Sequence, residues 1–248
     1  MTIHIMDERT YRAHPALSRS LLDKIKKSPA HLKWAKENEE PDTDYFRFGR
    51  LVHSAVLEPD KFWPSIIVWD GARRYGKTWD EFKVKHADKE ILTASEESQI
   101  LAISNAVMLH GVNLTGTAEG SIFWKDERTG LELKARLDLI GNTVVFDLKT
   151  TQDASAESFL RSALDYGYHR QAAWYLDAAR AAGHPAEAFV FIAVEKAAPY
   201  GVATYVLDAA LIDRGRLENE ANLDLYKACK ESGHWPGYPT QPTILRAL

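Results

Sequence analysis

Apolar and polar residues follow one another along the chain with two different periods. Apolar positions three and four residues apart predict amphipathic helices, which cover about 45–57, 93–110, 154–164, 168–182 and 209–231. Alternating positions or short apolar runs between turn residues predict strands, at about 65–69, 118–125, 131–140, 143–149, 188–195 and 201–207. The order is helices, a three-stranded meander, two helices and two further strands. It favours an α/β fold, with a central mixed β-sheet flanked by helices.

Turn and capping residues set the expected ends of these elements. Gly141-Asn142 predicts a tight turn between the second and third strands of the meander. Residues 71–90 are polar and aromatic without a clear period, and we expect irregular structure there. Pro29 suits the first position of a short helix. Side chains that accept hydrogen bonds mark helix starts, and the candidate N-caps are Ser18 or Ser20, Ser28, and Thr93 or Ser95.

Composition bounds the domain organisation. The chain has 248 residues, of which 45% are hydrophobic, and this is enough for one sizeable core. We therefore expect a single domain over 1–248, with a helical part to about 115, a catalytic sheet with helices over about 116–232, and an extended C-terminal tail. The N-terminal stretch carries Asp7, Glu8, Arg9 and Arg12 and does not resemble a secretory signal.

Charge and cysteine content limit the expected cellular location and partners of the protein. No apolar run is long enough to cross a membrane, and the single cysteine, Cys229, excludes an internal disulfide and a multi-cysteine zinc site. A cytoplasmic location fits best. The net charge of −4 argues mildly against a nucleic-acid partner. A local basic patch remains compatible with it, because acidic metal ligands lower the sum.

The chemistry concentrates at the end of the meander. Asp147 and Lys149 are two positions apart on one strand, so their side chains share a face. The tight turn is expected to bring Asp138 of the preceding strand beside Asp147. Two adjacent carboxylates repel each other unless one is protonated or a cation lies between them, and oxygen ligands suit Mg²⁺ or Mn²⁺. For a lone Asp-x-Lys, an ordinary surface charge pair is the more common explanation.

Four further residues could belong to the same centre. Gln171 and Tyr175 are one helical turn apart, so they share a helix face. His53 lies on an otherwise apolar helix face, where a hydrogen-bonded core histidine is the more common case. Glu119 begins the first meander strand and could add a carboxylate, although a solvated strand end is the commoner role.

Taken together, these residues resemble the PD-(D/E)xK nuclease superfamily, in particular its branch of RecE-like (exodeoxyribonuclease VIII) and phage alkaline exonucleases. The resemblance spans about residues 15–180 and keeps the order of the family's motifs. The matching stretches are Leu17-Ser-Arg-Ser-Leu-Leu with Ser28-Pro29, Phe48-Gly-Arg-Leu-Val-His53, Ala135-Arg-Leu-Asp138, Asp147-Leu-Lys-Thr150 and Tyr168-His-Arg-Gln-Ala-Ala-Trp-Tyr175.

The resemblance implies a restriction-endonuclease-like core and a role for each motif residue. Metal would be bound by His53, Asp138, Asp147 and the backbone carbonyl of Leu148, as one or two Mg²⁺ or Mn²⁺ ions. Lys149 would be the catalytic lysine. Gln171 and Tyr175 would support the centre, whereas Glu119 has no firm counterpart. Two positions depart from the commoner pattern: Asp147 stands where glutamate is usual, and Leu137 replaces the proline of the superfamily name.

The same resemblance implies a substrate and partners. Members of this branch degrade duplex DNA from free 5′ ends and leave 3′ single-stranded tails for homologous recombination. They form rings, with a trimer favoured over a tetramer here, and act beside a single-strand annealing protein. No membrane is involved, and a bacterial, phage or prophage origin is expected. Candidate DNA contacts are Arg19, Ser20, Ser28 and Arg136 for a 5′ phosphate, Lys26, Lys27, Arg73, Arg74 and Lys77 for the backbone, and Trp69, Tyr75 and Trp79 for stacking.

Three other hypotheses stay open at this point. The same centre could serve a structure-specific or RecB-like repair nuclease. The chain could be a DNA-binding module that has lost catalysis, although the intact set of two acids and a lysine speaks against it. It could also be a metal-free α/β protein with an accidental motif.

Overall fold

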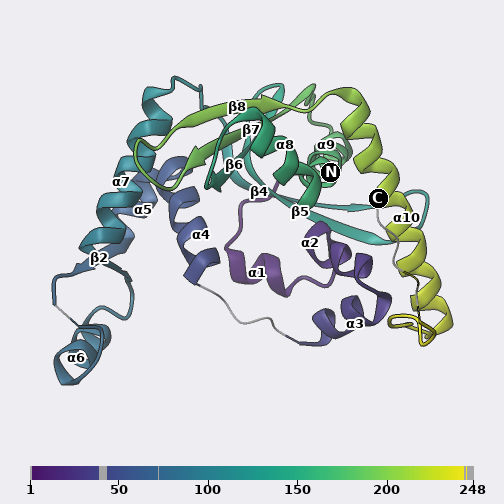
Figure 1. The fold of residues 1–248 in the computed structure, drawn as a ribbon, viewed down its shortest axis with the longest axis horizontal. Coiled ribbons are helices and arrows are strands. Elements are labelled where there is room, and N and C mark those ends of the chain that lie inside the picture. The colour runs from purple at the N-terminus through teal and green to yellow at the C-terminus, as the bar shows by residue number, and fades with distance from the viewer. Residues whose placement is uncertain (1, 39–43, 72, 243, 245–248) are drawn as a thin grey trace.

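A six-stranded mixed sheet forms the centre of the computed structural model, which describes residues 2–38, 44–71, 73–242 and 244 (Figure 1). Strand β5 pairs with β1 and β4, and the sheet continues from β5 through β6 and β7 to β8. The pairs β1·β5 and β6·β7 are parallel, and the others are antiparallel. The strands are β1 (Leu17–Ser18), β4 (Thr117–Lys125), β5 (Glu132–Ile140), β6 (Val144–Thr151), β7 (Ala188–Glu195) and β8 (Val202–Val206).

Helices cover both faces of this sheet, so the predicted fold class is confirmed. Helices α4, α5 and α7 pack on one face, and α2, α3, α8, α9 and α10 on the other. Their bounds are α1 (Glu8–Ala13), α2 (Arg19–Leu22), α3 (Pro29–Glu37), α4 (Asp44–Leu57), α5 (Pro59–Ser65), α7 (Ala94–Leu109), α8 (Ala156–Asp165), α9 (Tyr168–Ala181) and α10 (Ala209–Ser232), with a 3-10 turn η1 (Asp23–Lys26) after α2.

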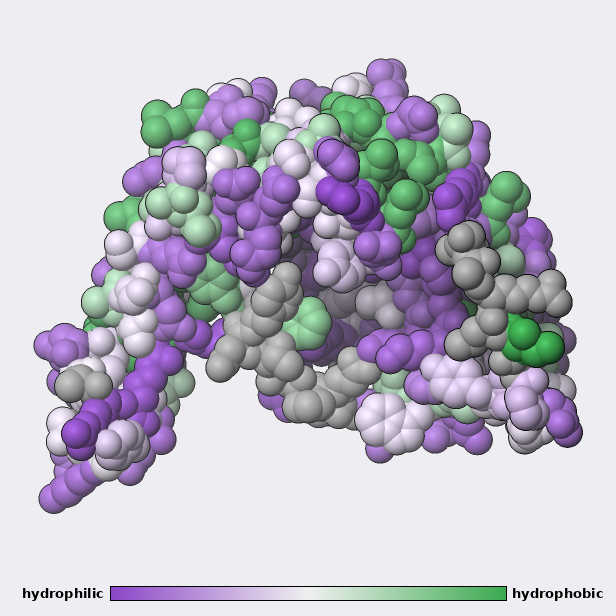
Figure 2. All heavy atoms as spheres, viewed as in Figure 1, coloured by the Kyte–Doolittle hydropathy of each residue, from purple (hydrophilic) through white to green (hydrophobic). Residues whose placement is uncertain are grey.

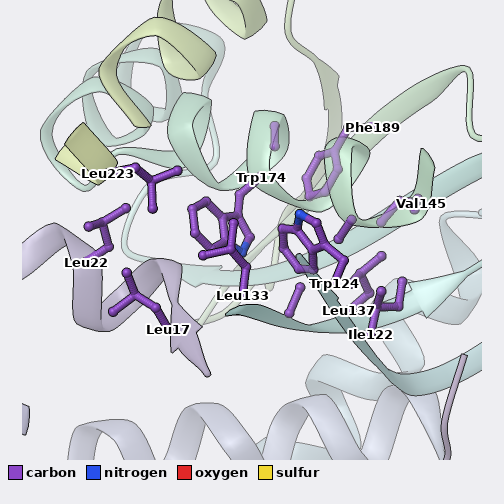
Figure 3. Close-up of a cluster of buried hydrophobic side chains, with 14 of the residues drawn as sticks. Leu17, Leu22, Ile122, Trp124, Leu133, Leu137, Val145, Trp174, Phe189 and Leu223 are labelled. Atoms are coloured by element: carbon purple, nitrogen blue, oxygen red, sulfur yellow. The ribbon is translucent and has the colours of Figure 1, made fainter. Parts of the chain in front are cut away.

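Two hydrophobic cores result from the alternation of side chains along the strands. Phe191 and Ala193 of β7 join the core under α9 and α10, whereas Ile192 and Val194 join the core under α4 and α7. In the larger core, the rings of Trp124 and Trp174 meet edge to face with centroids 5.4 Å apart (Figure 3). Both faces of the central sheet are therefore covered by packed helices.

One expectation about the fold is wrong. Residues 71–90 are not irregular throughout, because they contain α6 (Lys77–Lys85) and the start of β3 (Glu90–Thr93), which pairs in parallel with β2 (Ile66–Trp69). This segment projects from the body of the molecule (Figure 1). The rings of Trp69, Trp79 and Phe82 form a small cluster of their own. Such a local cluster needs no long amphipathic period, so the sequence pattern did not reveal it.

The ends of other elements refine the predictions. Ser18, rather than Ser20, caps α2, and Thr93 caps α7 with a reciprocal bond to Glu96. The turn between β5 and β6 lies one residue later than expected: Gly141 donates its N–H to the carbonyl of Val144, so Asn142 and Thr143 form the tip.

The described part of the C-terminal tail has no helix or strand after α10, as expected, while residues 243 and 245–248 lie outside the description. Among the described helices, none combines the length and the apolar character that crossing a membrane requires.

Close packing of α9 on α10 makes one glycine critical. A Cβ at Gly215 would lie 2.2 Å from the carbonyl oxygen of His169. We expect Gly215→Ala to lower the free energy of unfolding by about 1–3 kcal/mol, because the two helix backbones would have to separate. Gly49→Ala on α4 is the matched control, since a Cβ there meets nothing within 4 Å. It should leave stability unchanged or raise it by up to about 1 kcal/mol. Urea unfolding of both variants tests this, and equal midpoints would contradict it.

Candidate active site

The site is built where β5 and β6 move apart. The ladder between these strands consists of Leu139↔Phe146 and Ile140↔Val145, close to the turn. Continued by one step, this register puts Asp138 opposite Asp147, but there a side chain replaces the backbone pairing. The carboxylate Oδ2 of Asp138 accepts the backbone N–H of Leu148 at 3.0 Å. The N–H and C=O of one strand residue point to the same side, so the Leu148 carbonyl faces the opening too.

Asp147 is fully buried and held by two neighbours. Its Oδ1 accepts a hydrogen bond of 2.6 Å from Nε2 of Gln171 on α9, and its Oδ2 pairs with the ammonium of Lys149. The Lys149 Nζ also lies 4.9 Å from the ring centroid of Tyr168. These contacts fix the acid and the lysine against each other, as their shared strand face predicts.

His53 completes the group from α4. Its Nδ1 lies 3.1 Å from Oδ2 of Asp138. Burial alone would lower the pKa of His53, but the charge and hydrogen bond of Asp138 outweigh it and raise that pKa. The pKa of Asp138 is lowered in return, although burial acts against this change. His53 is thus a partner of the carboxylate and not an isolated core histidine.

Asp147 behaves differently from Asp138. Burial raises the pKa of Asp147 to about 6, the ammonium of Lys149 opposes the shift, and the charge of Asp138 adds to it. Ionising a group whose folded pKa is raised costs folding free energy. Without a cation, stability is therefore lost as pH rises from the ordinary aspartate value through about 6. A divalent cation beside Asp138 and Asp147 would remove this cost.

The donor set fits such a cation. One ligand atom from each of His53, Glu119 and Asp138 lies within 4.8 Å of the others. Asp147 lies close enough to Asp138 for the two charges to interact, and the Asp138 carboxylate accepts the N–H of Leu148. Carboxylate and carbonyl oxygens with one imidazole suit Mg²⁺ or Mn²⁺. The geometry therefore supports a metal centre, without distinguishing the two ions.

Arg136 and Tyr175 border the same centre. The Nε of Arg136 donates to Oε2 of Glu119 at 2.5 Å, and its guanidinium lies 5.8 Å from the ring centroid of Tyr11. Burial raises the pKa of Tyr175 well above its usual value, and the charges of Asp138 and Asp147 add to this. Tyr175 is therefore a neutral hydroxyl near the acids.

Most of the other candidate DNA contacts have partners within the protein, and Arg19 is close enough to Tyr175 for its charge to oppose the rise in the pKa of that hydroxyl. Arg19 donates to the carbonyl of Gly167 at 3.1 Å and pairs with Asp23 at 2.8 Å. Ser28 caps α3 and bonds His31, and Ser20 lies 3.2 Å from Ser18. Three more basic candidates and the three aromatic ones lie within or just before the projecting segment: Arg73, Arg74, Lys77, Trp69, Tyr75 and Trp79. Arg74 pairs with Glu96, Lys77 pairs with Glu81, and the Arg73 guanidinium lies over the ring of Tyr75. Their DNA-binding roles stay predictions.

Helix α1, which the apolar pattern did not predict, brings Tyr11 to the site. Lys134 of β5 anchors the helix end by donating to the carbonyls of Tyr11, Arg12 and His14 at 2.7–3.1 Å. One feature of the sequence could have predicted α1, namely its N-cap. Asp7 accepts the backbone N–H of Thr10, and an aspartate three residues before such a donor is typical of a helix start. The helix has only six residues, too short for a clear apolar period.

Comparisons with known proteins agree with the fold and identify the family. The family model described as PDDEXK-like domain of unknown function (DUF3799) matches residues 18–247. The solved structure of a candidate exonuclease from Eubacterium rectale superimposes with a TM-score of 0.64 at 13% identity, covering 99% of this chain and 96% of that one. At this identity, the likeness supports the fold alone. None of the curated proteins matches the sequence.

Two more solved structures are less similar. A phage-related exonuclease from Haemophilus somnus 129PT has a TM-score of 0.39 at 15% identity, with 91% of this chain and 100% of that chain covered. An alkaline exonuclease from Laribacter hongkongensis has a TM-score of 0.34 at 15% identity, with 74% and 95% covered. Their TM-scores are too low to carry an argument about this chain.

The buried acids predict a pH-dependent response to metal. At pH 7.5, Mn²⁺ should raise the melting temperature, because binding at 100 times the dissociation constant adds about 2.7 kcal/mol. At pH 5 the gain should shrink sharply, because Asp147, with a pKa of about 6, is then mostly protonated. Thermal unfolding with and without Mn²⁺ measures both values. An equal gain at the two pH values, or an undiminished gain in Asp147→Asn, would contradict the site.

Proposed function

The chain belongs to the family of PDDEXK-like domains, and from this premise we propose that it is a metal-dependent nuclease that hydrolyses duplex DNA from free ends. The membership confirms the superfamily to which the five motifs are similar. The observation that carries the proposal is the convergence of Asp138, Asp147 and Lys149 at the opening between β5 and β6. We also propose that the whole chain forms one nuclease domain.

A bound divalent ion would neutralise charge on the scissile phosphate and lower the pKa of a water. His53, Asp138, Asp147 and the Leu148 carbonyl would hold it. Lys149 has the position to orient the attacking water, since its ammonium is already fixed by Asp147 and the ring of Tyr168. We assign it this role, because a positioned cationic donor also favours the hydroxide form of that water.

Gln171 acts through Asp147 and not on the substrate. Its amide donates to one carboxylate oxygen of Asp147. This hydrogen bond would keep the orientation of Asp147 fixed if the Lys149 ammonium moved toward the attacking water. Tyr175, four residues later on α9, offers a neutral hydroxyl on the same helix face. We propose that it donates to an oxygen of the scissile strand.

Arg136 supports a phosphate contact. Its Nη1 is buried and has no hydrogen-bond partner among the described residues. A buried donor without a partner costs free energy, and an anionic group of the substrate would satisfy it. Arg136 also lies two residues before Asp138 on β5, so both side chains are on one face of the sheet. The middle of the face drawn in Figure 2 is hollowed and lined by hydrophilic residues, as a charged substrate requires.

The finer features of the activity rest on the resemblance to RecE-like and phage exonucleases. We propose digestion from the 5′ end, 3′ single-stranded tails, Mg²⁺ or Mn²⁺ as cofactor, a ring-shaped oligomer around the duplex and a single-strand annealing protein as partner. The net charge of −4 does not oppose this, because two of the acids, Asp138 and Asp147, are the proposed metal ligands.

Digestion of end-labelled DNA tests the proposal. With Mg²⁺, linear duplex labelled at the 5′ end should release labelled mononucleotides first, and a closed circle should remain intact. Lys149→Ala should lower the rate by about 10²–10⁴-fold, since it removes the group that positions the water. The variant should still bind linear duplex in a gel-shift assay, because the metal ligands and Arg136 remain.

Other outcomes would point to the alternatives. Cutting of the closed circle would favour a structure-specific repair nuclease. Binding of duplex without any metal-dependent digestion would favour a DNA-binding module. Undiminished digestion by Lys149→Ala would contradict the assignment of this lysine.

A further inference from the structure

Glu119 has a backbone conformation that a residue with a side chain seldom adopts. Its φ is +55°, in the left-handed region, near the start of β4. Its neighbours Ala118 and Gly120 pair with Leu139 and Leu137 of β5, so Glu119 lies opposite Asp138 at an interruption of the ladder. Strained conformations of this kind gather at functional sites. The question is therefore what the side chain contacts.

The Glu119 carboxylate faces the metal centre. Its ligand atom lies within 4.8 Å of those of His53 and Asp138. One oxygen, Oε2, accepts from Nε of Arg136 at 2.5 Å, which orients the carboxylate, and a carboxylate can offer its second oxygen to a cation. Burial raises the pKa of Glu119, and the charge of Asp138 adds to the rise. Two acids at this distance are unfavourable without a positive charge between them.

The salt bridge with Arg136 uses only one carboxylate oxygen of Glu119. Ser121 pairs in register with Arg136, so Glu119 lies on the face of the sheet that carries Arg136 and Asp138, whatever the local backbone conformation. The assignment therefore rests on the clustering of the Glu119 carboxylate with the ligand atoms of His53 and Asp138.

We propose that Glu119 is a metal ligand, which holds a divalent ion together with His53 and Asp138. This inference rests on the proposed function, and it adds a residue that the family's motifs do not supply. Asp138 would then lie between this ion and Asp147 of β6, so the residues suffice for two ions. Arg136 becomes a positioning residue for Glu119, in addition to its proposed contact with phosphate.

Mn²⁺ titration followed by electron paramagnetic resonance tests the inference. Glu119→Gln keeps the size of the side chain and removes its charge. We expect it to lose one bound ion or to bind Mn²⁺ at least 10-fold more weakly than the wild type. Glu132→Gln is the matched control, because Glu132 is an exposed carboxylate on the adjacent strand β5. It should bind Mn²⁺ as the wild type does.

Glu119→Gly separates the ligand from the strain. Glycine adopts a φ of +55° without cost, so the metal-free Glu119→Gly variant should melt at a higher temperature than Glu119→Gln, which also lacks the carboxylate that pairs with Arg136. It should still bind Mn²⁺ at least 10-fold more weakly than the wild type. Wild-type Mn²⁺ affinity and stoichiometry in both Glu119 variants would overturn the inference. If the wild type then still digests linear duplex, the proposed function stands. If the wild type itself binds no Mn²⁺, both fall together.

Discussion

The site depends on one break in backbone pairing. One edge of β5 is shared by two strands, since β1 pairs near its start and β6 near its end. Between them, the Asp138 carboxylate takes the Leu148 N–H that a continuous ladder would have used. This bond satisfies a backbone donor that would otherwise be left without a partner. It also turns the Leu148 carbonyl and the side chains of Asp147 and Lys149 toward the same opening. The arrangement of these groups is thus a consequence of how the sheet separates.

Electrostatics explains why such a site is costly when no cation is bound. The fully buried Asp147 has a pKa of about 6, and it is balanced by Lys149 and Gln171 on opposite oxygens. Asp138 is balanced by His53 instead. Each acid therefore has its own partner, and the partners come from α4, β6 and α9. The two hydrophobic cores hold these elements in place, because Leu148 packs under α4 while its neighbours in sequence carry the charges. We therefore expect the folded protein to be less stable without a cation, because its donors are held close together for binding one.

Much of this could be predicted from the sequence, because the relevant patterns are local. Strand alternation places Asp147 beside Lys149, and helical spacing places Gln171 on the face of Tyr175. The fold class followed from the order of elements, and the superfamily from the motifs. Helix α1 and Tyr11 were missed, because six residues give too short a period. The left-handed backbone of Glu119 has no signal in the sequence, since it arises from tertiary packing. Helix α6 was not predicted, because the contacts among the rings of Trp69, Trp79 and Phe82 leave no long apolar period in the sequence.

The central claim is that the separation of β5 from β6 creates a metal centre. A crystal of the protein soaked in Mn²⁺ and measured at a wavelength where manganese scatters anomalously tests it most directly. We expect an anomalous peak within coordination distance of Asp138, Asp147 and the Leu148 carbonyl, with the Lys149 ammonium beside it. A peak only at surface carboxylates, with the Asp138–Leu148 hydrogen bond and the Asp147–Lys149 pair intact, would contradict it.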